Sequence, residues 1–269
     1  MADCLISLGS NLGDSKLIVE SAIERLQVTA GIEQLLASEL LITKPIGGPA
    51  GQPDFVNGVA RFQTKLSPSA LLTTLLSTEE ELGRIRRIRW DARMIDLDIL
   101  LYGDLVSSDQ SYQIPHPRMC YRRFVLEPAM EIAGEMIHPV TGTSLKELLD
   151  NLNQRENKIL IVTDSVAIQK KWIPDEQPSK AGFTVHISDV ASAAGHLDGR
   201  TTLPKLLVLL SFFNSTDNTT GDTAFFRAKI KTLIERHQGP ILFCSTDPGN
   251  TKSWQAFGIE LDAAIAAME

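Results

Sequence analysis

The order of apolar runs and helical repeats in the first hundred residues constrains the fold more than any other feature of this sequence. Short apolar or alternating runs predict strands at 4–8, 32–43, 55–64 and 95–102. Apolar residues at helical spacing predict a helix that begins at Asp14 or Ser15 and stops at Gly31. A second helix is predicted from Ser67 to about Leu82. The resulting order, β-α-β-β-α-β, predicts a ferredoxin-like sandwich, an α+β fold in which helices cover one face of a sheet.

The rest of the chain predicts further helices and then a second domain. Helices are expected at 122–133 and 144–153, after a proline-rich loop at 114–117, and the polar run 151–157 is interpreted as a linker. Beyond it the predicted segments are strands at 159–163, 183–187, 206–212 and 241–244 and helices at 223–237 and 252–268. This mixture predicts a small α/β domain with a parallel sheet. The expected domains are therefore 1–153 and 158–269.

Composition narrows the class of protein. Of 269 residues, 43% are hydrophobic and 22% charged, as in soluble globular proteins. No apolar run reaches the roughly 20 residues that cross a bilayer, and we expect neither a secretory leader nor membrane association. Three cysteines are too few for a disulfide framework and indicate reduced thiols in the cytoplasm. With 26 basic and 33 acidic residues the net charge is −7, which argues against nucleic acid as a partner.

A basic cluster followed at once by two carboxylates is the most informative local feature. The cluster consists of Arg84, Arg86, Arg87, Arg89 and Arg93. In a strand, Asp96 and Asp98 point to the same face, and paired carboxylates suit Mg²⁺ with phosphate oxygens. The guanidinium group of an arginine can donate two parallel hydrogen bonds to one phosphate. The juxtaposition predicts a magnesium-nucleotide site for transfer of a phosphoryl-type group. The alternative is a solvated basic face beside an ordinary Asp-x-Asp pair.

Short motifs surround this cluster and carry a family resemblance. In chain order they are GSNLGD (9–14), TKPIG (43–47), QPDFVN (52–57), EEELGR (79–84), RWDARMIDLDIL (89–100), IPHPRM (114–119) and RRFVL (122–126). Together they resemble the 6-hydroxymethyl-7,8-dihydropterin pyrophosphokinase family of folate biosynthesis, over about residues 3–153. Residue 91, an aspartate here, is usually glycine or alanine in the family signature.

The resemblance implies an activity and a set of site residues. Such enzymes transfer pyrophosphate from ATP to the hydroxymethyl group of the reduced pterin and release AMP. By resemblance, Asp96 and Asp98 hold two Mg²⁺ ions, and Arg84 and Arg93 are catalytic because they stabilise developing charge. The implied ATP contacts are Glu79, Arg86, Trp90, Ile99, His116 and Arg122. The implied pterin contacts are Thr43, Pro45, Ile46, Phe55, Asn57 and Phe124.

Two other functions are compatible with parts of the sequence. A non-catalytic regulator that binds pterin or nucleotide on the same fold is suggested by Asp91 and by the unassigned second half. A ferredoxin-like RNA binder is suggested by the arginines, but the net charge of −7 opposes it. Residues 158–269 resemble no family. We interpret them as a non-catalytic partner domain through which the chain could self-associate.

Overall fold

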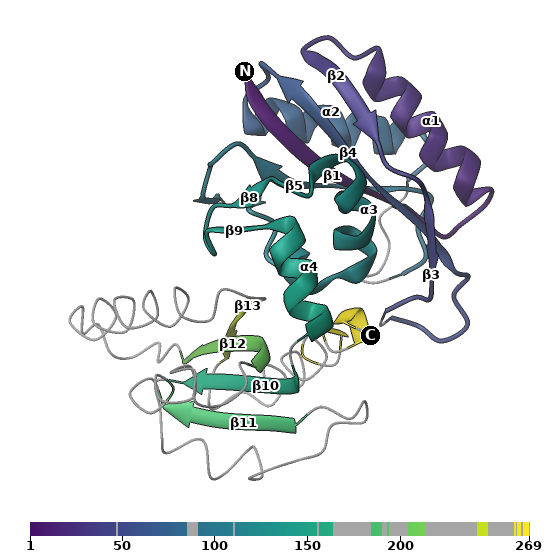
Figure 1. Ribbon diagram of the computed structural model, residues 1–269. Coiled ribbons are helices and arrows are strands. Elements are labelled where there is room, and N and C mark those ends of the chain that lie inside the picture. The colour runs from purple at the N-terminus through teal and green to yellow at the C-terminus, as the bar shows by residue number, and fades with distance from the viewer. Residues whose placement is uncertain are drawn as a thin grey trace. The chain divides into compact units, whose positions relative to one another are not determined.

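The computed structural model describes residues 1–46, 48–84, 91–109, 111–154, 156–163, 184–189, 193, 204–212, 241–246, 261, 263–264 and 266–268. Contacts divide the chain into two compact units. The first comprises Met1–Val140 and Ser144–Lys146, and the second Thr141–Thr143 and Glu147–Glu269. The whole is a mixed α/β protein, as predicted, and its first unit is built on an antiparallel sheet (Figure 1).

The main sheet of the first unit has five strands and β1 runs through its middle. Its strands are β1 (Ala2–Ser10), β2 (Ile32–Ala37), β3 (Leu41–Thr43), β4 (Phe55–Thr64) and β5 (Asp96–Tyr102). Their order is β2-β4-β1-β5, with β3 also paired to β4, and all pairs are antiparallel. The last residues of β1 therefore lie between the first residues of β4 and of β5.

Helices α1 (Ser15–Gln27) and α2 (Pro68–Glu81) begin where the sequence predicts. The Asp14 side chain accepts the N–H of Leu17, and the Ser67 hydroxyl accepts that of Ala70, so both first turns are capped. The two helices pack on one face of the sheet, where Cys4, Ile6 and Leu8 of β1 enter the same core as buried residues of both helices. The alternate residues of β1, including Ser7 and Gly9, face the other side.

The opposite face of the sheet carries α3 (Arg123–Ala133), which contacts β4. Arg61 of β4 donates to Ile132 O of this helix at 2.9 Å and forms an ion pair with Asp3 of β1 at 2.7 Å. The smaller elements are β6 (Ser107–Ser108), β7 (Gln113–Ile114), a 3-10 turn (Met119–Tyr121), β8 (Ile137–His138), β9 (Thr143–Ser144) and α4 (Leu145–Gln154).

Two predicted boundaries are wrong. The single strand expected at 32–43 is split into β2 and β3. The Ser38 hydroxyl accepts the N–H of Val59 at 3.1 Å and donates to Glu39 O at 2.9 Å, which interrupts the regular ladder along β4. The expected linker at 151–157 is largely regular structure. Leu145, Leu148 and Leu152 are fully buried at helical spacing, so the apolar stripe carries α4 to Gln154.

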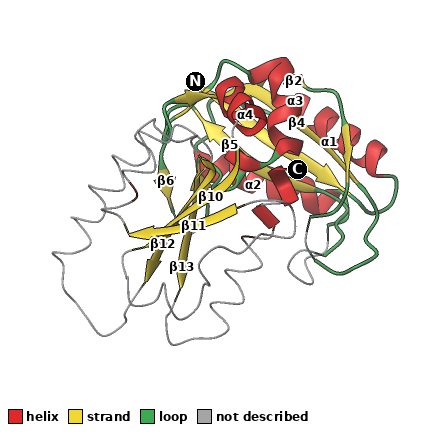
Figure 2. Cartoon of the chain, turned by 60° about the horizontal axis from the view of Figure 1, so that its bottom comes forward, coloured by secondary structure: helices red, strands yellow, loops and turns green. Residues whose placement is uncertain are grey.

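The second unit contains a four-stranded sheet (Figure 2). Its strands are β10 (Glu156–Thr163), β11 (Thr184–Asp189), β12 (Pro204–Phe212) and β13 (Ile241–Thr246). They lie in the order β11-β10-β12-β13 and pair in parallel. Each lies at a predicted strand. The helix expected at 223–237 lies outside the described residues, and the described residues between 261 and 268 are helical, as expected for 252–268.

No helix among the described residues combines the length and the apolar character needed to cross a bilayer.

Candidate active site

Gly9 lies at the centre of a shared surface on three strands. Its register partners are Asn57 on β4 and Asp96 on β5, and the next outward-facing residue, Ser7, pairs with Asp98. Directly paired residues point to the same face, so these polar side chains lie on the face that α1 and α2 leave open. A Cβ on Gly9 would lie 2.9 Å from Asn57 Oδ1. Because Gly9 has no side chain, the sheet surface between Asn57 and Asp96 stays uncovered at this point, and we call this surface the floor of the site.

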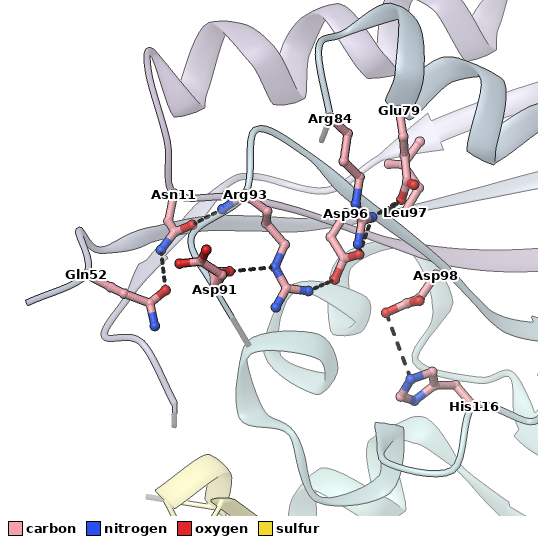
Figure 3. A network of polar contacts seen from close by, with 10 residues as sticks. All are labelled: Asn11, Gln52, Glu79, Arg84, Asp91, Arg93, Asp96, Leu97, Asp98 and His116. Atoms are coloured by element: carbon pink, nitrogen blue, oxygen red, sulfur yellow. Dashed lines mark hydrogen bonds and ion pairs between the residues drawn. The ribbon is translucent and has the colours of Figure 1, made fainter. Parts of the chain in front are cut away.

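Asp96 is held by two arginines from opposite ends of the arginine-rich segment (Figure 3). Arg84 Nη1 donates to Asp96 Oδ1 at 2.5 Å, and Arg93 Nη1 donates to Asp96 Oδ2 at 2.5 Å. Leu97, between the two aspartates, is buried at 3% exposure, so both carboxylates face the open side as the strand period predicts. Each carboxylate oxygen has two lone pairs, which leaves Asp96 able to bind a cation as well.

Glu79 stabilises this arrangement from α2, on the helix-covered face of the sheet. Its side chain is buried on α2, and Oε1 accepts the backbone N–H of Leu97 at 2.7 Å and a hydrogen bond from Arg84 Nη1. The carboxylate thereby fixes both the strand that carries the aspartates and one of the arginines that contacts Asp96. The contact of Glu79 with the nucleoside stays a prediction.

The two aspartates have opposite electrostatic environments. Burial disfavours the charge of Asp96, but Arg93 and Arg84 outweigh it, and the pKa of Asp96 is lowered. For Asp98, burial and then the charge of Asp96 raise the pKa to about 6, against the opposing effect of Arg122. The Asp98 side chain keeps 41% of its surface exposed, so water screens part of this effect. Asp98 is thus the carboxylate that most needs a cation.

His116 faces Asp98 as a neutral imidazole. Its Nε2 lies 3.9 Å from Asp98 Oδ2, while Nδ1 accepts the N–H of Arg118 at 3.1 Å. Burial, followed by the charges of Arg122 and Arg118, lowers the pKa of His116 well below its usual value. Because Nδ1 accepts, the ring proton belongs on Nε2, and it can be donated toward Asp98 or a bound phosphate.

The aromatic side of the site lies next to the same residues. Arg93 is stacked over the Phe55 ring at 6.0 Å from its centroid, and Arg122 over Phe124 at 5.3 Å. Phe55 and Phe124 are both half-buried, so neither is fully enclosed in the core, and their contacts with pterin stay a prediction. Asn57 Nδ2 donates to Thr43 Oγ1 at 2.8 Å, so the Asn57 amide is fixed across β4 and β3.

The structure does not bring every predicted residue into the site. The Ile99 side chain lies in the core with those of α1 and α2, so a nucleotide contact from Ile99 has to come from its backbone. Pro45 and Ile46 lie half-buried in the loop after β3. Arg86 and Trp90 lie outside the described residues. The sequence did not single out Asn11, which bridges Arg93 and Gln52, although this residue lies within the family motif at 9–14.

The donor set fits magnesium bound with a nucleotide. Among the described parts of the chain, no group of three or more His, Cys, Asp or Glu side chains could enclose a metal by itself. Asp96 and Asp98 supply hard oxygen ligands beside the arginines that Figure 3 shows. Mg²⁺ is commonly held by one or two carboxylates plus substrate phosphates and water. The residues present therefore match a metal that binds together with a polyphosphate.

Comparisons with known proteins agree with this geometry. The family model described as 7,8-dihydro-6-hydroxymethylpterin-pyrophosphokinase (HPPK) matches residues 5–134. The 2-amino-4-hydroxy-6-hydroxymethyldihydropteridine pyrophosphokinase of Synechocystis sp. is 38% identical over 149 residues, which are 55% of this chain and 75% of that protein. The folic acid synthesis protein fol1 of Pneumocystis carinii is 42% identical over 153 residues, 57% of this chain but only 20% of that protein.

A crystal structure of Plasmodium falciparum HPPK-DHPS with pteroate aligns over 96% of this chain and 83% of that one, with a TM-score of 0.44 and 11% identity, too distant a likeness to inform the fold. The similarity of sequence is much stronger, because the Synechocystis protein is matched over 75% of its own length. The range matched by the family model includes the aspartates and arginines of the site. The chain therefore belongs to the 7,8-dihydro-6-hydroxymethylpterin-pyrophosphokinase family.

Proposed function

We propose that this chain transfers the pyrophosphoryl group of ATP to 6-hydroxymethyl-7,8-dihydropterin, forming the pterin diphosphate and AMP in folate biosynthesis. One observation carries the proposal beyond family membership. Arg93 bonds to Asp96 and also lies over Phe55, so a single arginine joins the carboxylate side of the site to its aromatic side. A phosphate-binding region and a ring-binding region adjoin across the open floor at Gly9, as a transfer between a nucleotide and a pterin requires.

The two substrates are assigned to the two sides of that floor. On the nucleotide side, Arg84, Arg93, His116 and Arg122 offer donors for phosphate oxygens. Asp96 and Asp98 would hold two Mg²⁺ ions together with the ATP phosphates, where bound Mg²⁺ neutralises phosphate charge. On the pterin side, the ring would stack between Phe55 and Phe124, with Asn57 and the backbone of 43–46 at its polar edge. Glu79, Arg86, Trp90 and Ile99 complete the proposed ATP contacts.

The chemistry is an in-line displacement. The hydroxymethyl oxygen forms a bond to the β-phosphorus, the bond from that phosphorus to the α–β bridging oxygen breaks, and AMP and the hydroxyl proton leave. Negative charge grows on the transferred group and on the departing bridging oxygen. Arg84 and Arg93 stabilise that charge, and their fixed hydrogen bonds mean that little reorganisation accompanies the reaction.

The test is product identity. The purified chain is incubated with ATP, Mg²⁺ and 6-hydroxymethyl-7,8-dihydropterin, and nucleotides and pterins are separated by chromatography. We expect AMP and pterin diphosphate in equal amounts, and neither product with 6-methyl-7,8-dihydropterin, which lacks the hydroxyl. Formation of ADP would assign a different reaction. Tight binding of both substrates in calorimetry without turnover would favour the non-catalytic regulator.

The finer architecture is also part of the proposal. The observed order is β-α-β-β-β-α-β, in which β2 and β3 together replace the predicted second strand, and with the antiparallel register it supports a ferredoxin-like first domain at 1–153. The strand pairing of β10 to β13 supports a parallel α/β domain at 158–269, which we infer to be a non-catalytic module for self-association. Buried free thiols at Cys4 and Cys120 support a reducing, cytoplasmic location. Light scattering on the full chain measures the oligomeric state.

A further inference from the structure

Asn11 is a buried amide that connects the two segments on either side of the site. It follows β1 directly and is 1% exposed. Its Oδ1 accepts the N–H of Arg93 at 2.8 Å, and its own backbone N–H donates to Arg93 O at 3.1 Å. Its Nδ2 donates to Gln52 Oε1 at 3.2 Å and to Pro53 O at 3.2 Å. One side chain thus binds both the residues before β4 and the residues before β5 (Figure 3).

The orientation of this amide is fixed by its backbone partners. The N–H of Arg93 can only donate, so the atom that it meets has to be the amide oxygen. The carbonyl of Pro53 can only accept, so the atom facing it has to be the amide nitrogen. An amide is the side-chain group of this size that offers both, and a carboxylate could satisfy only the Arg93 half.

We propose that Asn11 is a positioning residue for the transfer reaction: it ties the segment before Phe55 to the main chain of Arg93, and so sets where the Arg93 guanidinium lies between the pterin ring and Asp96. This inference rests on the proposed function. The residues on both sides of the link are site residues, because Pro53 lies two residues before Phe55 and Arg93 contacts both Asp96 and Phe55. Movement of either segment therefore changes the place of the other.

The physical consequence is a mixed kinetic effect. If the side-chain link is lost, the Arg93 main chain keeps the hydrogen bond from the Asn11 backbone N–H but loses the one to Oδ1, so the position of its guanidinium on Asp96 is less well fixed. Misplacement of a catalytic group by about 1 Å can cost about a hundredfold in rate. The segment before Phe55 is released at the same time, which weakens pterin binding. Among the described residues, the side chain of Asn11 bonds to Gln52, Pro53 and Arg93, none of which is assigned only to the nucleotide, so the affinity for ATP should change least.

Kinetics of Asn11→Ala test the link. We expect kcat to fall about tenfold to a hundredfold and the pterin KM to rise severalfold, with a smaller change in the KM for ATP. Gln52→Ala removes only one of the contacts and should shift both parameters in the same direction by less, so the test survives if Asn11→Ala folds poorly. Kinetics within about twofold of the parent for both variants overturn the proposal.

Thr64→Val is the matched control. Thr64 lies at the other end of β4, is 1% exposed, donates to Gly31 O at 2.6 Å and accepts the N–H of Leu66 at 3.1 Å. Its replacement also removes buried hydrogen bonds, but ten-residue β4 separates it from Phe55. We expect a lower Tm with unchanged kcat and KM. If Thr64→Val reproduces the kinetic losses of Asn11→Ala, general destabilisation explains them and the proposal fails.

A double-mutant cycle identifies the route of the effect. In an Arg93→Ala background the guanidinium that Asn11 is proposed to position is absent. Asn11→Ala should then cause no further loss of kcat, while its effect on pterin KM remains. An equal loss of kcat in both backgrounds shows that Asn11 does not act through Arg93.

Amide exchange tests the link without any substrate. Exchange of the Arg93 N–H, followed by NMR, should accelerate in Asn11→Ala and stay slow in Asn11→Asp, since a carboxylate still accepts that N–H but opposes Pro53 O. If exchange is unchanged in Asn11→Ala, the link is not operative and the inference is wrong. If exchange responds as expected but the parent protein makes no pterin diphosphate, the proposed function has failed and the link itself stands.

Discussion

Arg93 donates to Oδ2 of Asp96 while Arg84 donates to Oδ1, so a single carboxylate anchors both ends of the segment between the two arginines. Among the described residues, the ion-pair partner of Asp98, two residues further along the same strand, is His116 at 3.9 Å. Two aspartates that the sequence presents as equivalent therefore have different surroundings. This difference can be measured.

Asp96→Asn and Asp98→Asn should both abolish most of the proposed transfer activity, by more than about a hundredfold, because each removes a proposed magnesium ligand. The two substitutions should change the Tm in opposite directions. Without Mg²⁺, Asp96→Asn should lower the Tm because it takes from Arg93 its carboxylate partner and from Arg84 one of its two. Asp98→Asn should raise the Tm because it removes a charge that burial and Asp96 disfavour. Calorimetric melts in EDTA, with activity at saturating Mg²⁺, check both, and near-normal activity in either variant contradicts the metal assignment.

Arg84→Ala and Arg93→Ala should each lower kcat by about a hundredfold to a thousandfold, with smaller effects on the KM values, since both are assigned to charge that develops during transfer. Arg25→Ala is the control. Arg25 also pairs with a glutamate, Glu81, but that ion pair is exposed and involves no site residue. Steady-state and single-turnover kinetics at one ionic strength compare the three. Equal losses would mean that the arginines contribute only diffuse positive charge.

Glu79→Ala should destabilise the protein by roughly 1–3 kcal/mol, because it leaves the N–H of Leu97 without its acceptor and Arg84 with Asp96 as its remaining carboxylate partner. Glu79→Gln keeps an acceptor for Leu97 and should lose less. Glu81→Ala, on the exposed side of the same helix, should change the free energy of unfolding by less than about 1 kcal/mol. Urea denaturation ranks the three variants. A Glu79→Ala variant as stable as Glu81→Ala would contradict the supporting role.

Gly9→Ala should raise the pterin KM at least several-fold, since its Cβ would lie 2.9 Å from Asn57 Oδ1 and the Asn57 amide is already held by Thr43. The same substitution in an Asn57→Ala background should add little, because the group with which the methyl collides is gone. Pterin titrations followed by fluorescence give the four affinities of the cycle. If the effects of the two substitutions on pterin affinity are additive, the loss in Gly9→Ala does not come from a collision with Asn57.

His138 should make stability depend on pH. It is 5% exposed, and burial lowers its pKa from 6.5 to about 4. As the pH falls, the unfolded chain takes up the proton first, so stability is full above about pH 6.5 and declines toward pH 4, by at most about 3 kcal/mol. The free energy of unfolding of the parent minus that of His138→Asn, measured from pH 4 to 8, isolates this term. A difference that does not vary with pH would show that His138 is not held neutral.

Local patterns in the sequence determined much of this protein. Asp14 and Ser67 begin helices because a side-chain oxygen next to a helical repeat can cap its first turn, and both do so. Asp96 and Asp98 share a face because strands have a period of two, and Leu97 between them is buried. The family motifs supplied the residues of the site and the reaction, although the individual roles stay predictions. Each of these inferences depends on neighbours within a few positions of one another.

What only the tertiary structure decided is how distant segments meet. Glu79 reaches Leu97 across 18 positions because α2 packs against β5, and Asn11 reaches Arg93 across 82 because β1 pairs with β5. The break at Ser38 depends likewise on the N–H of Val59, 21 positions away. A hydrogen bond of this kind leaves no periodic trace in the sequence. The residue types were visible in the chain, but their partners were set by strand pairing, which no local spacing encodes.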